Sequence, residues 1–154
     1  MSFVRTFLLA LTLLLAPVVA TADDSEASRL IALVNEFRAA HELAPVALEA
    51  KLSAAAQEHA EAMAASGKFS HDAPDGNLTE RMGRANYAFA TVTENIGEGS
   101  PTAKETVAMW AQSPPHARNL LNESVREAGI GHAKAPGKYA ADFWCLILAA
   151  PAPP

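Results

Sequence analysis

The apolar positions in the first half of the chain repeat at the spacing of amphipathic helices. The first such stripe consists of Leu30, Leu33, Val34 and Phe37. It predicts a helix over residues 25–41, with Ser25 as a candidate for the N-terminal cap. A second helix is predicted over residues 48–66, where alanine dominates, and Gly67 is well suited to end it. Because small side chains cover this second helix, we expect it to lie very close to its packing partner.

After Gly67 the pattern predicts a loop first and then further helices. Residues 68–99 are rich in Asp, Asn, Pro and Gly, which predicts a loop with one helical turn at 78–82 and a short strand at 90–94. Residues 102–105 have the form of a capping box and open a helix that runs to about Gln112. Pro114 and Pro115 are expected to end it, and a further short helix is predicted over residues 116–122.

Two strands are predicted at the end of the chain, over residues 127–134 and 138–149. Pro136 and Gly137 between them are typical of a type II turn, so the two strands should form a hairpin. The last strand is apolar on both faces, which indicates a sheet covered on both sides. The elements together predict an α+β fold, a three-layer α-β-α sandwich around a small, largely antiparallel sheet. Residues 151–154 are expected to fray.

The N-terminus has the features of an export signal. Arg5 precedes an apolar run over residues 7–15, and the small-x-small sequence at 20–22 offers a cleavage site. We therefore expect a signal peptide at 1–22 and one domain at 23–150. The alternative, a membrane anchor, is disfavoured because the apolar run is short for a bilayer and contains Pro17. The protein should be secreted or periplasmic, with no stable membrane span after cleavage.

Composition narrows the class of partner. The 154 residues carry a net charge of −5, and only 19% of them are charged. This balance excludes the basic surface that nucleic-acid binding requires. A single cysteine, Cys145, means that no disulfide can form within the chain. Its neighbours are apolar, so we expect Cys145 to behave as a small buried hydrophobic residue.

A series of short motifs, taken in order, resembles one known family. The matching segments are residues 34–38 (VNEFR), 56–60 (AQEHA), 69–71 (FSH), 93–97 (TENIG), 113–116 (SPPH), 119–121 (NLL) and 129–131 (GIG). Each segment is weak alone, but their order and spacing are similar to those of the CAP superfamily of cysteine-rich secretory, antigen 5 and pathogenesis-related proteins, also called SCP domains. The chain is most similar to the short bacterial branch, which lacks disulfides. The resemblance implies the same α-β-α sandwich.

The resemblance also implies a polar cleft with two histidines and acidic partners, at His71, Glu94 and His116. These residues lie too far apart in sequence to share one helix face, so only the fold can bring them together. Two imidazoles and a carboxylate are suitable ligands for zinc or another divalent metal. Metal binding should then require a pH above the ordinary histidine pKa of about 6.5. Because residues 110–113 lack the second glutamate that many relatives have, tight metal binding is in question.

Several functions stay open at this point. A secreted binding or interaction module is favoured, with an unknown extracellular or envelope ligand, including lipid or sterol in a groove near Tyr87 and Phe89. The simpler interpretation is that these two aromatic residues fill the core. The alternative function is a metal-assisted or Ser-His-Glu peptidase or esterase, in which His71, Glu94 and His116 would be catalytic with Ser70 or Ser113 as nucleophile. No sequence motif of a hydrolase supports this alternative.

The remaining polar residues are assigned structural roles. His59 lies on an apolar helix stripe and is interpreted as a packed structural histidine, while His41 and His132 are expected to be solvated. The residues Asp72, Asp75 and Asn77 resemble part of a calcium loop, but their spacing favours a polar turn.

Overall fold

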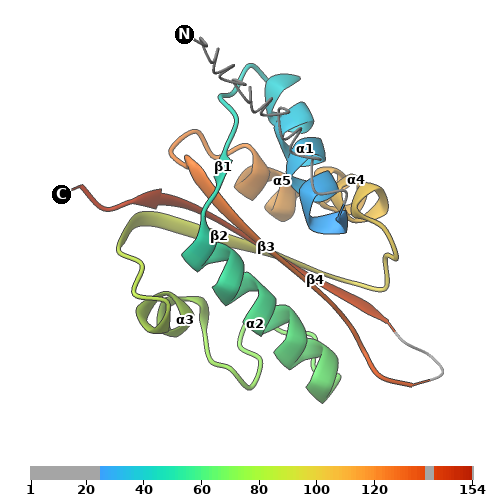
Figure 1. The fold of residues 1–154 in the computed structure, drawn as a ribbon. Helices are drawn as coiled ribbons and strands as arrows, with labels where there is room; N and C mark the ends of the chain where they lie inside the picture. Colours follow the sequence, from blue (N-terminus) through green and yellow to red (C-terminus); the bar gives the residue numbers. More distant parts are fainter. Residues whose placement is uncertain (1–24, 138–140, 154) are drawn as a thin grey trace, which may run out of the picture.

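A four-stranded mixed sheet forms the middle layer of the computed structural model, which describes residues 25–137 and 141–153. The elements in chain order are α1 (Glu26–Ala39), β1 (Ala47–Leu48), α2 (Ala50–Ser66), α3 (Leu78–Arg84), β2 (Phe89–Glu98), α4 (Ala103–Gln112), α5 (Pro114–Leu120), β3 (Glu127–Lys134) and β4 (Asp142–Pro151). Helices α1, α4 and α5 cover one face of the sheet, and α2 and α3 cover the other (Figure 1). The predicted three-layer α+β fold is confirmed.

The strand order β1-β3-β4-β2 places the last strand inside the sheet and β2 at one edge. β4 pairs antiparallel with both β3 and β2, and the two-residue β1 pairs parallel with β3. The sheet is therefore largely antiparallel, as predicted. β4 is buried from Asp142 to Ala149, which agrees with the prediction that both of its faces are covered.

Two hydrophobic clusters fill the spaces between the layers. On the α1 side, Trp110 of α4 and Leu30 of α1 pack against Trp144 and Leu146 of β4. On the α2 side, alanines of α2 and Met82 of α3 pack against the alternate residues of β4, including Cys145. Because successive strand residues point to opposite faces, one strand contributes to both clusters.

Helix α2 lies very close to β3, as its small residues predict. A Cβ atom built on Gly129 would stand 2.0 Å from the carbonyl carbon of Leu52, and one built on Gly131 would stand 2.1 Å from the carbonyl oxygen of Ala56. Neither position has room for a side chain. Together, the glycines of β3 and the alanines of α2 allow the helix and the strand to lie in contact.

The signals for helix ends are confirmed where they are local. The side chain of Ser25 accepts a hydrogen bond from the backbone N–H of Ser28, and Thr102 caps α4 through the N–H of Glu105. Gly67 ends α2 in the left-handed conformation, with φ of 65°. Asn86 also adopts a left-handed conformation, with φ of 50°.

Three predicted boundaries were wrong for identifiable reasons. Pro114 and Pro115 begin α5 rather than only ending α4, because a proline at the first helical positions lacks an N–H that would have had no partner there. The strand expected at 90–94 is longer, since β2 pairs with β4 as far as Glu98. Leu48, expected in a helix, belongs to β1 instead, where its pairing with β3 prevails over helix propensity.

The structure describes only part of the chain ends and of the predicted hairpin. The predicted signal peptide at 1–22, residues 138–140 of the hairpin and Pro154 lie outside the described residues. Pro151 still belongs to β4, and the N–H of Ala152 donates to the carbonyl of Ala88, so the beginning of the tail expected to fray is bonded. No helix within residues 25–137 and 141–153 has the length and apolarity needed to cross a membrane.

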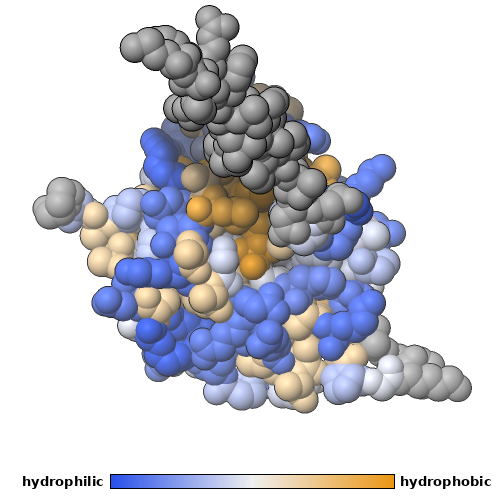
Figure 2. All heavy atoms as spheres, viewed as in Figure 1, coloured by the Kyte–Doolittle hydropathy of each residue, from blue (hydrophilic) through white to orange (hydrophobic). Residues whose placement is uncertain are grey.

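The surface is mainly hydrophilic on the face shown in Figure 2, around one apolar area near the middle. That area lies where β1 passes between the helical layers (Figures 1 and 2). Leu48 in β1 is 51% exposed.

Candidate functional site

An open cavity of about 500 Å³ lies beside β2, between the loop that follows α2 and the start of α3. Its lining is mostly polar and consists of His71, Asp72, Asn77, Leu78, Thr79 and Glu94. The loop is positioned because Asn77 caps α3: its side chain accepts from the N–H of Glu80, and the Glu80 side chain accepts from the N–H of Asn77. This reciprocal cap fixes the point at which the loop enters the helix.

His71 and Glu94, two of the predicted site residues, meet in this cavity. The Nδ1 atom of His71 lies 2.8 Å from Oε1 of Glu94. The His71 side chain is 55% exposed, whereas that of Glu94 is only 3% exposed. Because a carboxylate only accepts hydrogen bonds, Nδ1 carries the hydrogen. The other ring nitrogen, Nε2, has no hydrogen bond to any described residue and is free to contact a ligand.

The contact between His71 and Glu94 shifts the pKa of both groups. The hydrogen bond to Glu94 raises the pKa of His71, and this effect exceeds the opposing effects of burial and of the Arg81 charge. Burial alone would raise the pKa of Glu94, but the hydrogen bond from His71 and the positive charge of Arg81 outweigh burial and lower that pKa. Glu94 therefore stays ionised, and His71 keeps its positive charge to a higher pH than an ordinary histidine.

His116 approaches from the other helical layer, on α5. Its Nδ1 lies 2.9 Å from the hydroxyl oxygen of Ser113, and its carbonyl accepts from the side chain of Asn95. Asn119 donates to the carbonyl of Glu94, so α5 is anchored directly to the edge strand. Burial lowers the pKa of His116, and the nearby charge of His71 lowers it further. His116 is thus an electrostatic neighbour of His71, without a described contact to Glu94.

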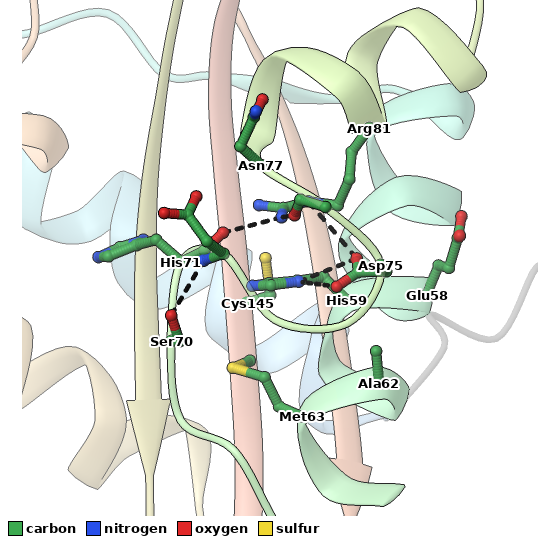
Figure 3. A network of polar contacts seen from close by, with 12 residues as sticks. Glu58, His59, Ala62, Met63, Ser70, His71, Asp75, Asn77, Arg81 and Cys145 are labelled. Atoms are coloured by element: carbon green, nitrogen blue, oxygen red, sulfur yellow. Dashed lines mark hydrogen bonds and ion pairs between the residues drawn. The ribbon is translucent and has the colours of Figure 1, made fainter. Parts of the chain in front are cut away.

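His59 has a larger role than that of a packed structural histidine. Its side chain is fully buried, as predicted, but Nδ1 lies 2.8 Å from Oδ1 of Asp75. Its Nε2 lies 3.9 Å from Oε1 of Glu94 and has no hydrogen-bond partner. Figure 3 shows His59 reaching from α2 towards Asp75 underneath the loop. A second imidazole–carboxylate pair therefore lies directly beneath the exposed one.

Arg81 links these two pairs. Its side chain is fully buried and donates through Nη2 to Oε2 of Glu94, while Nε lies 3.7 Å from Oδ2 of Asp75. The thiol of Cys145 also contacts Oε2 of Glu94, at 3.4 Å, so Cys145 is buried as predicted but adjoins the site. Burial, and then the Glu94 charge, raises the pKa of Cys145 well above its usual value, which keeps it a thiol.

The arrangement does not fit the three-ligand metal site expected of His71, Glu94 and His116. Within the described parts of the chain, no group of three or more His, Cys, Asp or Glu side chains is placed to hold a metal ion. Both oxygens of Glu94 are engaged, one by His71 and the other by Arg81. The raised pKa of His71 also means that protons compete with a metal for the ring up to a higher pH.

A serine nucleophile is not assembled either. Ser70 accepts a hydrogen bond from the N–H of Asp72. Ser113 contacts His116, but no carboxylate of a described residue is bonded to that ring. In the known arrangement, one histidine bonds both the serine and the acid. Here the histidine that bonds a serine and the histidine that bonds Glu94 are different residues.

The turn and the aromatic residues have structural roles. Asp75 bonds His59 and Asn77 caps α3, which are contacts of a polar turn. Tyr87 and Phe89 pack against the α2-side cluster, as the simpler interpretation holds, and the Tyr87 hydroxyl donates to Glu127.

One prediction for a surface histidine was wrong. His41 is exposed, as expected. His132, also expected to be solvated, stacks on Trp144 with ring centroids 3.9 Å apart, and its Nε2 lies 2.7 Å from Asp142. The adjacent strand β4 supplies both partners, which the local sequence around His132 does not indicate.

Comparison with known proteins agrees with this fold. The model of the cysteine-rich secretory protein (CAP) family matches residues 31–148. The Bacillus subtilis protein YkwD is 27% identical over 116 residues, which are 75% of this chain and 45% of YkwD. The chain therefore spans less than half the length of that relative.

Two solved structures have similar folds. One, an extracellular SCP-domain protein from Bacillus anthracis, has a TM-score of 0.72 and 27% identity over 80% of this chain and 40% of its own. The other, an outer surface protein of Borrelia burgdorferi, has a TM-score of 0.72 and 18% identity, over 82% of this chain and 93% of its own. With a family model that matches most of its length, the chain belongs to the cysteine-rich secretory protein (CAP) family.

Proposed function

We propose that this chain is an extracellular binding domain whose cleft at His71 and Glu94 takes a polar ligand. One observation carries the proposal: an exposed imidazole is held by a buried carboxylate through Nδ1, which leaves Nε2 available at an open polar cavity. Binding sites commonly use a few polar groups with fixed orientation. The paired charges of Glu94 and Arg81 hold the ring without a bound ligand.

The chemistry of the lining indicates the class of ligand. When His71 is protonated, Nε2 donates a hydrogen bond, and the raised pKa extends this state towards neutral pH. Asn77 and Thr79 add short polar side chains, while Asp72 disfavours a strongly anionic ligand. These groups suit a neutral or weakly charged ligand rich in hydroxyl and carbonyl oxygens, as in the glycan and peptide parts of a cell envelope.

Location outside the cytoplasm is supported by two observations. The first 22 residues have the sequence features of a secretory signal. The Bacillus anthracis neighbour is described as extracellular and the Borrelia burgdorferi neighbour as an outer surface protein. Secretion, with release or retention in a periplasm as its two outcomes, is therefore part of the proposal.

The test measures binding at His71 directly. Side-chain NMR signals of His71 are followed while soluble peptidoglycan glycopeptides are added to the purified protein. We expect saturable shifts, and a Kd at least about tenfold weaker in His71→Ala, because a hydrogen bond to a charged group contributes about 1.5–3 kcal/mol. His41→Ala removes an exposed histidine outside the cavity lining and serves as the matched control.

Competing functions appear as other outcomes of the same experiment. Binding of sterol or lipid vesicles but not glycopeptides would contradict a polar ligand. Zinc binding that is lost in both His71→Ala and His116→Ala would restore the metal site. Turnover of a peptide or ester that is lost in His71→Ala would replace binding with hydrolysis.

A further inference from the structure

Arg81 is a buried cation that contacts the site from below and that the motifs around His71 do not include. Its side chain is fully buried on α3. It donates through Nη1 to the carbonyl oxygens of His71, at 3.0 Å, and Gly76, at 2.5 Å. It donates through Nη2 to the carboxylate of Glu94. Figure 3 shows Arg81 extending from α3 into the loop that carries His71.

The hydrogen bonds from Arg81 hold both the backbone of His71 and, through Glu94, its ring. The Nη1 group holds the backbone carbonyl of His71, and Nη2 holds the carboxylate that bonds the His71 ring. The bond to Gly76 fixes the far end of the loop. The planar guanidinium thus sets the distance between the loop and β2, and with it the position of the imidazole relative to Glu94.

The orientation of the ring has a chemical consequence. Glu94 can only accept, so the hydrogen of a neutral His71 must lie on Nδ1, and Nε2 then offers its lone pair outward. Which nitrogen carries the hydrogen is set by the hydrogen bond that the ring makes. A change in the position of Glu94 would therefore change whether Nε2 of His71 offers a ligand a lone pair or a hydrogen.

We propose that Arg81 is a positioning residue that fixes the Nδ1–H tautomer of His71 and presents Nε2 to the cleft. The inference rests on the proposed function only in taking Nε2 as the ligand-facing atom. Arg81 itself is buried and does not line the cavity. Asp75, 3.7 Å from Nε of Arg81, is the neighbouring carboxylate on the other side of the guanidinium.

A lysine separates geometry from charge. Arg81→Lys keeps the positive charge near Glu94 but replaces a planar fork with a single ammonium group on a flexible stem. That group cannot hold the carbonyls of His71 and Gly76 together with Glu94 in the same geometry. If Arg81 acted only through its charge, lysine would preserve the tautomer of His71.

The experiment records ¹⁵N NMR spectra of the histidine rings at alkaline pH, where the rings are neutral. In the wild-type protein we expect His71 to carry its hydrogen on Nδ1. In Arg81→Lys we expect the Nδ1–H fraction to fall and the Nε2–H fraction to rise. Arg84→Lys is the matched control, because Arg84 lies on the same helix and pairs with the exposed Glu58. It should leave the tautomer of His71 unchanged.

Two outcomes overturn the proposal. One is a wild-type His71 that carries its hydrogen on Nε2, a result that needs no variant. The other is an Arg81→Lys protein that folds and keeps the Nδ1–H form. If Arg81→Lys alone does not fold, the substitution is repeated together with Gly83→Ala, which adds a better helix former to α3. The NMR experiment on the tautomer contains no ligand. A failure to bind glycopeptides would therefore remove the proposed function and leave this inference standing.

Discussion

His59 and Asp75 form a buried pair, with Nδ1 of His59 2.8 Å from Oδ1 of Asp75, one level below the exposed pair of His71 and Glu94. His59 belongs to α2 and Asp75 to the loop, so this contact attaches the loop to the helical layer. The cleft is therefore supported from below by buried polar side chains that belong to the core.

Asp75→Asn should strongly destabilise the fold. The substitution removes the carboxylate that His59 contacts and one of the two carboxylates nearest Arg81. Removal of one partner from a buried pair costs about 3–5 kcal/mol. Urea denaturation measures the change in the free energy of unfolding. Asp72→Asn, at an exposed position of the same loop, is the control and should change little. Equal effects of both substitutions would contradict the importance of the buried pair.

Gly129→Ala should also destabilise, for a steric reason. The added Cβ would stand 2.0 Å from the backbone of Leu52, so α2 would have to move away from β3. Overpacking of this kind costs about 1–3 kcal/mol, and a backbone obstacle places the expected loss at the upper end. Gly83→Ala offers the contrast, since a Cβ there meets nothing within 4 Å and the residue lies in α3. It should stabilise by about 0.5–1 kcal/mol. Thermal unfolding measures both changes in stability. The argument is wrong if Gly129→Ala stabilises the protein and Gly83→Ala destabilises it.

The two cleft histidines should titrate on opposite sides of pH 6.5, the ordinary value. The hydrogen bond to Glu94 raises the pKa of His71, while burial and the charge of His71 lower that of His116. NMR titration gives both midpoints. In His71→Ala the midpoint of His116 should rise, because a nearby positive charge is gone, whereas His41→Ala should leave it in place. An unchanged His116 midpoint in His71→Ala would show that the two rings do not interact.

Stability should depend on pH with a sign set by these shifts. The raised pKa of His71 contributes stability that is complete below the unfolded value, near 6.5, and lost as pH rises through the folded pKa. The lowered pKa of Glu94 contributes stability above its unfolded value, near 4.3, which is lost as pH falls through the folded pKa. Between these two values both contributions are present. Denaturation midpoints of Glu94→Gln should therefore fall less steeply on the acid side than those of the wild type; an unchanged decline would contradict the assignment.

The Cys145 thiol should be inert in the native protein. It is fully buried, and its raised pKa suppresses the reactive thiolate. A thiol reagent should react with it only at the rate at which the protein unfolds, and at once in denaturant. Rapid reaction of the native protein would show that the core opens at β4.

Local sequence signals predicted the elements, and long-range contacts decided the rest. Ser25, Gly67 and Thr102 act on residues three or four positions away, so their capping roles can be recognised from a short window. Pro114 was misinterpreted because a proline can both end one helix and begin another. The two residues of β1 are too few for a periodic pattern, and their pairing with β3 depends on the completed sheet.

The site was predictable only where a motif of the family marks it. His71 and Glu94 lie within such motifs, and the structure brings them together. Asp75 and Arg81 were missed, since an aspartate in a turn and an arginine on a short helix are ordinarily solvated. One signal for Arg81 can be recognised once the structure is known. Arg81 lies next to Met82 on the buried side of α3. A buried arginine requires acidic or carbonyl partners nearby.

The position of β4 determines when the sheet can form. Among the residues that the structure describes, β2 and β3 both pair with β4, the last strand, and β1 pairs only with β3. When the chain has been made up to residue 141, all five helices and the strands β1, β2 and β3 are present, yet β2 has no strand with which to pair. The complete sheet can therefore form only after β4 has been synthesised.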